Sequence, residues 1–299
     1  MKTITIIGAN SYIARNLIQY IKVNELGIEL YLYDRESTHK DCCSGYAPVN
    51  ILDEESVSAI KFDVDAVMLF AGKTGTYAGF DEPSVFVNVN ELGLLNVLNA
   101  MRKSSSQAKL IFPSTRLVYK GKDEPLGEDD EKEFKTIYAV NKYACEQYIK
   151  MYSNVFGINY CIFRICVPYG TILEGVGSYG TAEFFLGSAK EKKNISLYGR
   201  GDVKRTLTYI GDLCNTIIEG AFCDKCIDDV YNIGGETYSL NDMASEIAKI
   251  YGVELEYVPW PESALRIESG STVFDSSKLD GIIGNMRHMT FTKWIGGEG

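Results

Sequence analysis

Histidine is scarce in this chain: among 299 residues there are only two, His39 and His288. Histidine is the commonest protein ligand of metals, so little is present from which a histidine-based metal centre could be built. Eight cysteines occur, but only Cys223 and Cys226 form a C-x-x-C pair, and no second pair accompanies them. Zinc sites usually need four such ligands. We therefore predict no metal, and we interpret the pair as part of a turn between a helix and a strand.

Positive charge is not in excess either. The chain has 30 Lys and Arg against 40 Asp and Glu, which gives a net charge of −10, and no basic block occurs. This balance argues against a nucleic-acid binder or a polybasic membrane anchor. No apolar run reaches transmembrane length, and the first residues, M-K-T-I-T-I-I-G, have the pattern of a strand rather than of a signal peptide. We expect no nucleic-acid partner, no membrane partner and a cytoplasmic location.

The first half of the chain alternates between short apolar or β-branched runs and segments with helical apolar spacing. This alternation is typical of an α/β fold, with a doubly wound parallel sheet and helices on both faces. Beyond residue 167 the alternation weakens, and 168–180 has the composition of a loop. The predicted strands are 3–7, 29–34, 66–71, 110–114, 160–166, 206–210 and 229–233, and the predicted helices are 12–22, 54–60, 83–102, 138–156, 182–193, 213–222 and 240–251.

A glycine follows the first predicted strand and precedes the first predicted helix, in the order Gly8-Ala-Asn-Ser11-Tyr-Ile-Ala14. In dinucleotide-binding βαβ units, glycines make this turn and let backbone N–H groups approach a pyrophosphate at the helix N-terminus. Gly8 is the only glycine left of a G-x-x-G-x-x-G pattern, since Ser11 and Ala14 replace the other two. Alanine still permits close helix–strand packing. On its own the motif fits a dinucleotide site and an ordinary strand–turn–helix equally well.

Two further strand ends carry residues that suit a dinucleotide. Asp34 ends the second predicted strand, where a carboxylate accepts hydrogen bonds from ribose hydroxyls, and this favours NAD. Arg35 follows directly and could meet a 2′-phosphate, so NADP stays open. Phe70, Ala71 and Gly72 end a later strand with mostly small residues, as close contact between backbone and cofactor requires. Each of these positions is also compatible with a simple turn.

Tyr138 and Lys142 are four residues apart in Y-A-V-N-K. On a helix this spacing puts a phenol and an ammonium on one face, one turn apart. A neighbouring cation favours the phenolate, so Tyr138 could act as a general base at ordinary pH. A base beside a nicotinamide is what hydride transfer from an alcohol needs. Tyrosine–lysine pairs at this spacing are common on helices, so the significance of this pair depends on the other motifs.

Together these motifs resemble the extended short-chain dehydrogenase/reductase family, and within it the NAD-dependent nucleotide-sugar epimerase/dehydratase group. Members place a serine or threonine four residues before the tyrosine of a V-Y-G segment, the position of Thr115 in S-T-R-L-V-Y-K. The family's Y-x-x-x-K pair and trailing glutamate are matched by Tyr138, Lys142 and Glu146. The resemblance covers nearly the whole chain. Further matching segments are N-E-L-G-L-L-N-V-L from Asn90, F-R-I-C-V-P-Y-G from Phe163, G-R-G-D-V-K-R-T-L-T-Y-I-G-D from Gly199, Y-N-I-G-G from Tyr231 and D-S-S-K from Asp275.

The resemblance implies a Rossmann-type NAD(P)-binding domain at 1–166, which also receives the segment near 206–234, and a smaller mixed C-terminal domain at 167–299 that mainly binds substrate. It implies a nucleotide-diphosphate sugar as substrate, NAD as cofactor with NADP not excluded, and a homodimer formed through helices 83–102 and 138–156. Thr115, Tyr138 and Lys142 are the implied catalytic residues. The implied cofactor contacts are Gly8, Asn10, Ser11, Tyr12, Ile13, Asp34, Arg35, Asn50, Ile51, Phe70, Ala71, Gly72, Lys73, Asn90, Tyr138, Lys142 and Cys166. The implied substrate contacts are Thr115, Val167, Arg205 and Arg266, the two arginines being otherwise ordinary solvated surface residues.

Several positions depart from the family pattern besides the glycine turn. Asn50 stands where an aspartate often contacts adenine, and Val167 replaces an asparagine that usually touches the substrate. Lys120 replaces the glycine that follows V-Y. These departures leave the identity of the substrate open more than the use of the cofactor.

Three functions fit the resemblance. In an epimerase, Tyr138 takes the proton from a sugar hydroxyl at C4, the carbon's hydride passes to NAD⁺, and the keto sugar takes it back on its other face. The alternative is an NAD(P)H-dependent reductase of a 4-keto-6-deoxy nucleotide sugar. A dehydratase is disfavoured because Arg116 and Leu117 stand where those relatives carry an Asp-Glu pair. A non-catalytic NAD(P)-sensing protein is the third possibility, since fold does not fix function.

Overall fold

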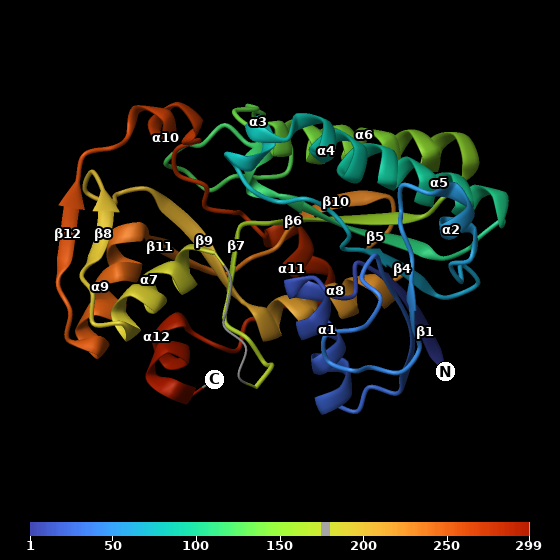
Figure 1. Cartoon of the computed structure of the whole chain (residues 1–299), viewed down its shortest axis with the longest axis horizontal. Helices are drawn as coiled ribbons and strands as arrows, with labels where there is room; N and C mark the ends of the chain where they lie inside the picture. The colour runs from blue at the N-terminus through green and yellow to red at the C-terminus, as the bar shows by residue number, and fades with distance from the viewer. Residues whose placement is uncertain (175–179, 299) are drawn as a thin grey trace.

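The computed structural model describes residues 1–174 and 180–298, and its largest element is a seven-stranded sheet (Figure 1). The strand order is β10-β6-β5-β4-β1-β2-β3, and every neighbouring pair is parallel. This confirms the predicted α/β fold with a Rossmann-type, doubly wound parallel sheet. The strands of the sheet are β1 (Lys2–Ile7), β2 (Ile28–Asp34), β3 (Tyr46–Pro48), β4 (Ala66–Leu69), β5 (Lys109–Thr115), β6 (Tyr160–Ile165) and β10 (Asp229–Asn232).

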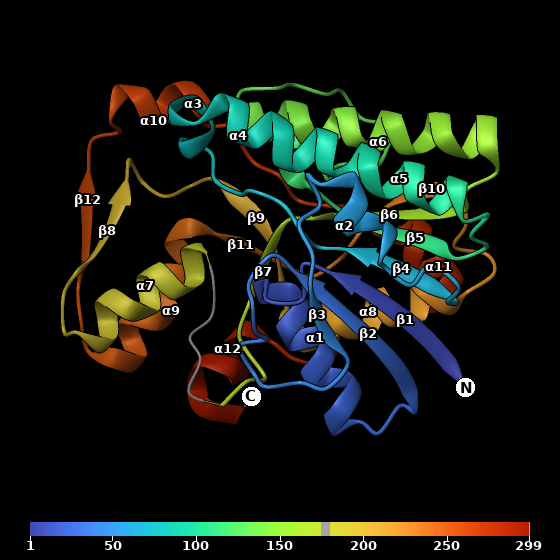
Figure 2. The same ribbon diagram turned by 45° about the vertical axis from the view of Figure 1, so that its right-hand side comes forward.

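Helices cover both faces of this sheet because successive side chains of each strand point to opposite faces (Figure 2). In β1, Ile4 and Ile6 belong to one buried apolar cluster, whereas Ile7 belongs to the other. One face packs against α1 (Tyr12–Val23), α8 (Ile210–Phe222) and α11 (Ser277–Ile283). The other packs against α2 (Glu54–Ser58), α5 (Gly93–Lys103) and α6 (Ile137–Phe156).

The helix predicted at 83–102 is not a regular α-helix throughout. It consists of α4 (Pro83–Val87), a π-helical turn η1 (Asn88–Leu92) and α5, and the short α3 (Ala78–Asp81) precedes it. The spacing of apolar residues does not reveal a single π-helical turn within a helix, so the sequence could not predict η1. The turn contains Asn90, which is buried against the loop that follows β4. Such π-turns often occur at functional sites.

The C-terminal half adds two small sheets, one of strand order β11-β9-β7 and one in which β12 pairs with β8. The segment predicted as a loop at 168–180 begins within a strand, β7, while 175–179 lie outside the described residues. The sequence analysis missed this strand because three residues are too few to show alternation. The strands are β7 (Val167–Tyr169), β8 (Ile195–Tyr198), β9 (Lys204–Tyr209), β11 (Glu236–Ser239) and β12 (Leu255–Val258), and the helices and helical turns are η2 (Arg116–Val118), α7 (Thr181–Lys190), α9 (Leu240–Tyr251), α10 (Glu262–Ile267), α12 (Phe291–Lys293) and η3 (Trp294–Glu298).

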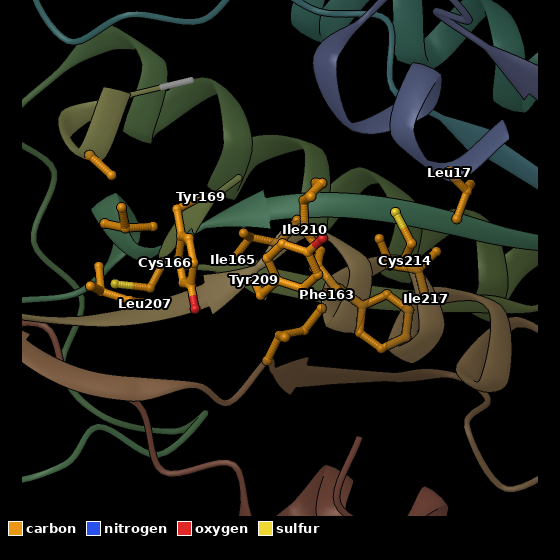
Figure 3. Packing of buried hydrophobic residues seen from close by; sticks show 14 of the residues in the cluster. Leu17, Phe163, Ile165, Cys166, Tyr169, Leu207, Tyr209, Ile210, Cys214 and Ile217 are labelled. Atoms are coloured by element: carbon orange, nitrogen blue, oxygen red, sulfur yellow. The ribbon is translucent and has the colours of Figure 1, made fainter. Parts of the chain in front are cut away.

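One apolar cluster runs from the large sheet into the C-terminal half (Figure 3). Phe163 of β6 and Cys214 of α8 belong to it together with Tyr169 of β7 and Leu207 of β9. The two halves therefore share a core, and β10 extends the large sheet although it lies beyond β7 in the chain. The division of the chain at residue 166 stays a prediction.

The strand order of the large sheet reverses between β1 and β4: β2 and β3 follow on one side, β5, β6 and β10 on the other. In open α/β sheets, the crevice outside the carboxyl ends of the strands at such a point is the usual ligand site. Gly8 directly follows β1, and Phe70 directly follows β4. The fold thus brings these two predicted strand ends together.

Candidate functional site

A cavity of about 280 Å³ lies at the carboxyl ends of β1, β2 and β4. Most of the predicted cofactor contacts line it, although they come from four separate segments of the chain. These are Gly8, Asn10, Ser11, Asp34, Arg35, Asn50, Ile51, Phe70, Ala71, Gly72 and Lys73. Ile7, Glu36, Lys40, Val49, Leu52 and Val89 also line it and were not predicted.

Gly8 makes the turn that the sequence predicted, and no other residue fits there. Its φ is +91°, and a Cβ at this position would lie 2.2 Å from the backbone nitrogen of Ala71. The N–H groups of Gly8 and Ala9 both donate to the carbonyl of Tyr33, at 2.7 and 3.0 Å. The turn is therefore clamped between the ends of β2 and β4, which brings its backbone to the floor of the cavity.

Ser11 takes the place of the second glycine without strain, because its φ of −72° is open to any residue. It is the N-cap of α1, and its Oγ accepts a hydrogen bond from the N–H of Ala14 at 3.4 Å. The first N–H groups of a helix have no partner within it, so this end of α1 can receive an anion. The turn thus fits the pyrophosphate of a dinucleotide despite the lost glycines.

Two carboxylates, Asp34 and Glu36, lie at the end of the cavity formed by β2. The Oδ2 of Asp34 accepts from the backbone N–H of Asn10 at 3.0 Å, which fixes the carboxylate beside the glycine turn. Arg35 and Lys40 line the same cavity, and Lys40 lies 3.5 Å from Glu36. A pair of carboxylates suits a ribose diol better than a 2′-phosphate. This end of the cavity therefore fits NAD.

A second cavity of about 550 Å³ adjoins the first, since Ser11, Phe70 and Gly72 line both. It contains all three predicted catalytic residues, and Tyr12, Ile13 and Cys166 of the predicted cofactor contacts. The lining residues that were not predicted are Thr74, Gly75, Thr76, Pro113, Ser114, Arg116, Leu117, Ile165 and Pro168.

Three elements position the catalytic residues. Thr115 ends β5 and caps η2, its Oγ1 accepting from the N–H of Leu117 at 3.3 Å. Tyr138 is the second residue of α6, whose start is fixed by Thr136, the N-cap that accepts from the N–H of Ala139. Lys142 follows one turn later, with its Nζ 6.0 Å from the centre of the Tyr138 ring. The predicted juxtaposition of phenol and ammonium is thus present in the fold.

Lys142 is buried, and its Nζ donates to the carbonyl of Pro113 at 2.7 Å and lies 4.3 Å from the centre of the Phe112 ring. Burial lowers the pKa of this amine to about 8, although Cys145 and Glu146 act in the opposite direction. The amine is therefore still mostly protonated at neutral pH, and it is held where its charge can favour a phenolate at Tyr138.

A buried polar network supports this arrangement from behind. Glu146 of α6 accepts from Ser114 at 2.5 Å and from the Nε and Nη2 of Arg164 at 3.0 and 2.6 Å. Arg164 also donates to the Tyr119 hydroxyl at 2.7 Å, which in turn donates to Asn232 at 2.7 Å. The network ties α6 to β5 and β6, whose ends line the second cavity, and to β10 beside them.

Four predicted contacts do not line either cavity. Asn90 is buried; its Oδ1 accepts from the N–H of Lys73, and its Nδ2 donates to the carbonyl of Lys73. It therefore shapes the loop after β4. Val167 is buried in β7. Arg205 is buried, with its guanidinium bonded to the carbonyl of Gly270 and, at 2.6 Å, to Glu268. Arg266 is exposed on α10 and pairs with Glu262.

Among the described residues, no group of three or more His, Cys, Asp or Glu side chains could hold a metal ion. Cys223 and Cys226 lie in the turn between α8 and β10, as the sequence indicated. No helix in the described part of the chain combines the length and apolar character needed to cross a membrane.

Comparison with known proteins places this geometry in a family. The model of the NAD dependent epimerase/dehydratase family matches residues 4–234. A UDP-glucuronate 4-epimerase of Thermodesulfobacterium geofontis is 26% identical over 212 residues, which span 69% of this chain and 64% of that protein. A UDP-N-acetyl-alpha-D-glucosaminuronate decarboxylase of Bacillus cytotoxicus is 27% identical over 210 residues, 68% of this chain and 64% of that protein. The match thus covers slightly less than two thirds of each relative.

Solved structures share the fold over nearly the whole chain. The UDP-glucose 4-epimerase of Thermus thermophilus, solved with NAD, superposes with a TM-score of 0.84 at 23% identity. The superposition covers 98% of this chain and 96% of that one. At this identity the likeness shows the fold alone, over nearly the whole chain and so also beyond residue 234, where the family model ends.

Proposed function

Because the chain belongs to the NAD-dependent epimerase/dehydratase family, we propose that it is a nucleotide-sugar epimerase acting by transient oxidation of one sugar carbon, C4. Membership confirms the resemblance seen in the sequence and the prediction of NAD as cofactor. The observation that carries the proposal is that Thr115, Tyr138 and Lys142 meet in one cavity, which adjoins the cavity that fits the dinucleotide.

The residues of the second cavity have distinct roles in this reaction. Tyr138 as phenolate removes the proton of the sugar hydroxyl, and Lys142 keeps the phenolate charge stabilised through its ammonium. Thr115 hydrogen-bonds the same sugar oxygen and so fixes the carbon that reacts. When bound, NAD supplies the acceptor for the hydride and returns it afterwards. A cavity of about 550 Å³ leaves room for the keto sugar to turn over before it is reduced on its other face.

The charge of the cavity supports an epimerase rather than a dehydratase. Elimination of water needs a general acid and a general base beside the reacting carbons. Among the described residues that line the second cavity there is no aspartate and no glutamate. Arg116 and Leu117 follow Thr115 directly and both face this cavity. The acid–base pair that elimination requires is therefore missing from the place where it would act.

The relatives support a nucleotide-diphosphate sugar as substrate. One acts, by its name, as a UDP-glucuronate 4-epimerase and another as a decarboxylase of a UDP-linked sugar acid. Both names contain a nucleoside diphosphate joined to a sugar, and both reactions take place at the sugar. We extend this substrate class to the present chain as part of the proposal.

The test uses the purified protein with its bound cofactor and a panel of nucleotide sugars, with sugar products identified by NMR and NADH followed by its near-ultraviolet absorbance. We expect interconversion of two epimers without net change of the cofactor. Tyr138→Phe should lower the rate at least about a hundredfold, because the general base is lost. Tyr143→Phe is the matched control: this tyrosine also lies on α6 but packs on Phe134 outside the cavity.

Other results would replace the proposal. Stoichiometric consumption of NADPH with a 4-keto sugar would establish the reductase. Retention of the protein's biological effect in Tyr138→Phe, with no turnover of any nucleotide sugar, would establish the non-catalytic sensor.

A further inference from the structure

Arg116 is a charged residue of the second cavity that the proposed mechanism does not use. It follows Thr115 directly, opens η2 and is partly buried. It lines the same cavity as Thr115, Tyr138 and Lys142. Its position next to the residue that would hold the reacting sugar oxygen puts its side chain at the sugar end of the site, not at the dinucleotide end.

The charges around Arg116 are not balanced. The charged side chains that line the second cavity, among the residues described, are Arg116 and Lys142, both cationic. Within the described chain, no carboxylate lies within ion-pair distance of Arg116, whose guanidinium donates to the Ser269 hydroxyl at 3.3 Å. An arginine in a protein of net charge −10 is thus left facing a cavity without an anion.

A second arginine lies beside the first. Arg205 donates to the carbonyl of Gly270, the residue after the Ser269 that Arg116 contacts. Glu268 neutralises Arg205 through a contact of 2.6 Å, so this group of two guanidiniums and one carboxylate has an excess positive charge. Burial and then the neighbouring Arg205 lower the pKa of Arg116 to about 10, whereas Cys166 and Glu268 act in the opposite direction.

We propose that Arg116 binds a carboxylate on the sugar ring of the substrate, so that the enzyme selects nucleotide sugars whose sugar is a uronic acid. This inference rests on the proposed function and names the substrate class of the same site. A guanidinium presents a planar fork of N–H donors that matches the two oxygens of a carboxylate. A carboxylate at this place supplies the missing negative charge, and a neutral hydroxymethyl group does not.

The diphosphate is the other anion of a nucleotide sugar. Its distance along the sugar from the group held by Thr115 decides whether Arg116 binds the diphosphate or the carboxylate. Thr115 and Tyr138 hold the hydroxyl oxygen on C4 in the proposed reaction, and the neighbouring ring carbon, C5, carries the C6 group. Arg116 lines the same cavity as Thr115 and Tyr138 and does not line the first cavity, so we infer that it meets this neighbouring substituent. The diphosphate is attached at C1, on the opposite side of the sugar ring.

The test measures dissociation constants of the NAD-bound protein for UDP-glucuronate, UDP-glucose and UDP, together with the corresponding thymidine, cytidine and guanosine compounds. UDP-glucuronate and UDP-glucose differ only in a carboxylate against a hydroxymethyl group. We expect the wild type to bind the uronate at least about tenfold more tightly. Arg116→Gln should weaken uronate binding about 10- to 100-fold and glucose binding less than about threefold. Arg116→Lys, which keeps the charge without the fork, should lie between.

Lys61→Gln is the control for a change in net charge, because Lys61 is exposed and precedes β4, at the opposite ends of the strands from the cavity. Equal losses for UDP, UDP-glucose and UDP-glucuronate would assign Arg116 to the diphosphate and overturn the inference. A wild type that binds nucleotide sugars without preferring the uronate would overturn it as well, while the proposed function stands. Failure of every compound to bind the wild type would overturn both, and the wild-type comparison needs no variant to fold.

Discussion

Lys142 is the residue whose environment most directly links the site to a measurable property. Burial lowers its pKa from an ordinary 10.5 to about 8. Between these two values the folded protein has released a proton that the unfolded chain still holds. The free energy of unfolding therefore rises with pH in this window, because the unfolded state binds more protons. The buried position in which Lys142 donates to the Pro113 carbonyl also places the amine near the phenol, so the cost to stability accompanies the catalytic arrangement.

We predict that cofactor-free wild-type protein gains about 2 kcal/mol of stability relative to Lys142→Met between pH 7 and pH 9.5, as such a pKa difference implies. Urea unfolding of both proteins at the two pH values measures this difference. The comparison cancels the titration of all other groups, since both proteins share them. A difference that stays constant with pH would show that Lys142 keeps its proton throughout.

Gly8 gives a sharper prediction about sterics. Gly8→Ala should abolish NAD binding and lower the free energy of unfolding by about 3 kcal/mol or more, because a Cβ would lie 2.2 Å from the backbone nitrogen of Ala71. Gly27→Ala is the matched control: its φ is also positive, at +63°, but nothing lies within 4 Å of the added Cβ. It should cost only about 1 kcal/mol. Thermal unfolding and NAD titration measure both, and equal effects would mean that φ strain alone matters.

At the residue scale, the sequence predicted the site best where a residue is adjacent in the chain to a strand end. Gly8, Asp34 and Gly72 follow or end strands and line the first cavity. The substrate contact of Arg205 stays a prediction; the structure shows this residue buried against Glu268, a partner that is 63 residues away and that no local pattern reveals. In the sequence, Arg116 was noted only because it replaces an acidic residue of the dehydratases, although it lines the second cavity. Its role as a binding residue required the fold.

Among the elements, α6 depends on one buried ion pair for its position against the sheet. Glu146 and Arg164 are both almost fully buried, and the carboxylate also receives the Ser114 hydroxyl, next to Thr115. Removing the charge of one partner would leave the other charge buried without compensation. The contact thus couples the helix that carries Tyr138 to the strand that carries Thr115.

We predict that Glu146→Gln lowers the free energy of unfolding by about 3 to 5 kcal/mol. Glu131→Gln is the control, because Glu131 forms a 2.9 Å ion pair with Lys120 in which both side chains are exposed. Exposed pairs are screened by water, so we expect no measurable change there. Urea unfolding measures the free energy of unfolding of both variants. Similar small losses in both would mean that Arg164 finds another partner or water.

The elements themselves were predictable where they are long and amphipathic. The helix at 240–251 was predicted with the bounds that α9 has, because its apolar face is visible in the sequence. The strands β3, β7, β8 and β11 were missed, since each has only three or four residues and pairs at an edge or in a small sheet. Their pairing depends on partners far away in the chain, which periodicity cannot show.

On the scale of the whole molecule, α6 and the α4–α5 region lie side by side on one face of the sheet (Figures 1 and 2). Val140, Met151 and Val155 are exposed on α6 at spacings of three turns and one turn. Val85 and Leu92 are exposed on α4 and η1, which pack against α6. Apolar residues at such spacing form one stripe along a helix. We propose that these stripes meet those of a second copy, giving the homodimer that the resemblance implies.

The proposed homodimer gives a prediction that needs no assay of catalysis. Met151→Glu and Leu92→Glu should each convert the dimer to monomer, because a dimer would bury an unpaired carboxylate at the centre of an apolar contact. Val23→Glu is the control, since Val23 is 59% exposed, close to the 54% of Met151, but ends α1 on the other face of the sheet. Sedimentation velocity at several protein concentrations measures the change. If the wild type sediments as a monomer at all of them, or if Val23→Glu dissociates it as well, the stripes are not the dimer contact and the apolar face of α6 must be explained in another way.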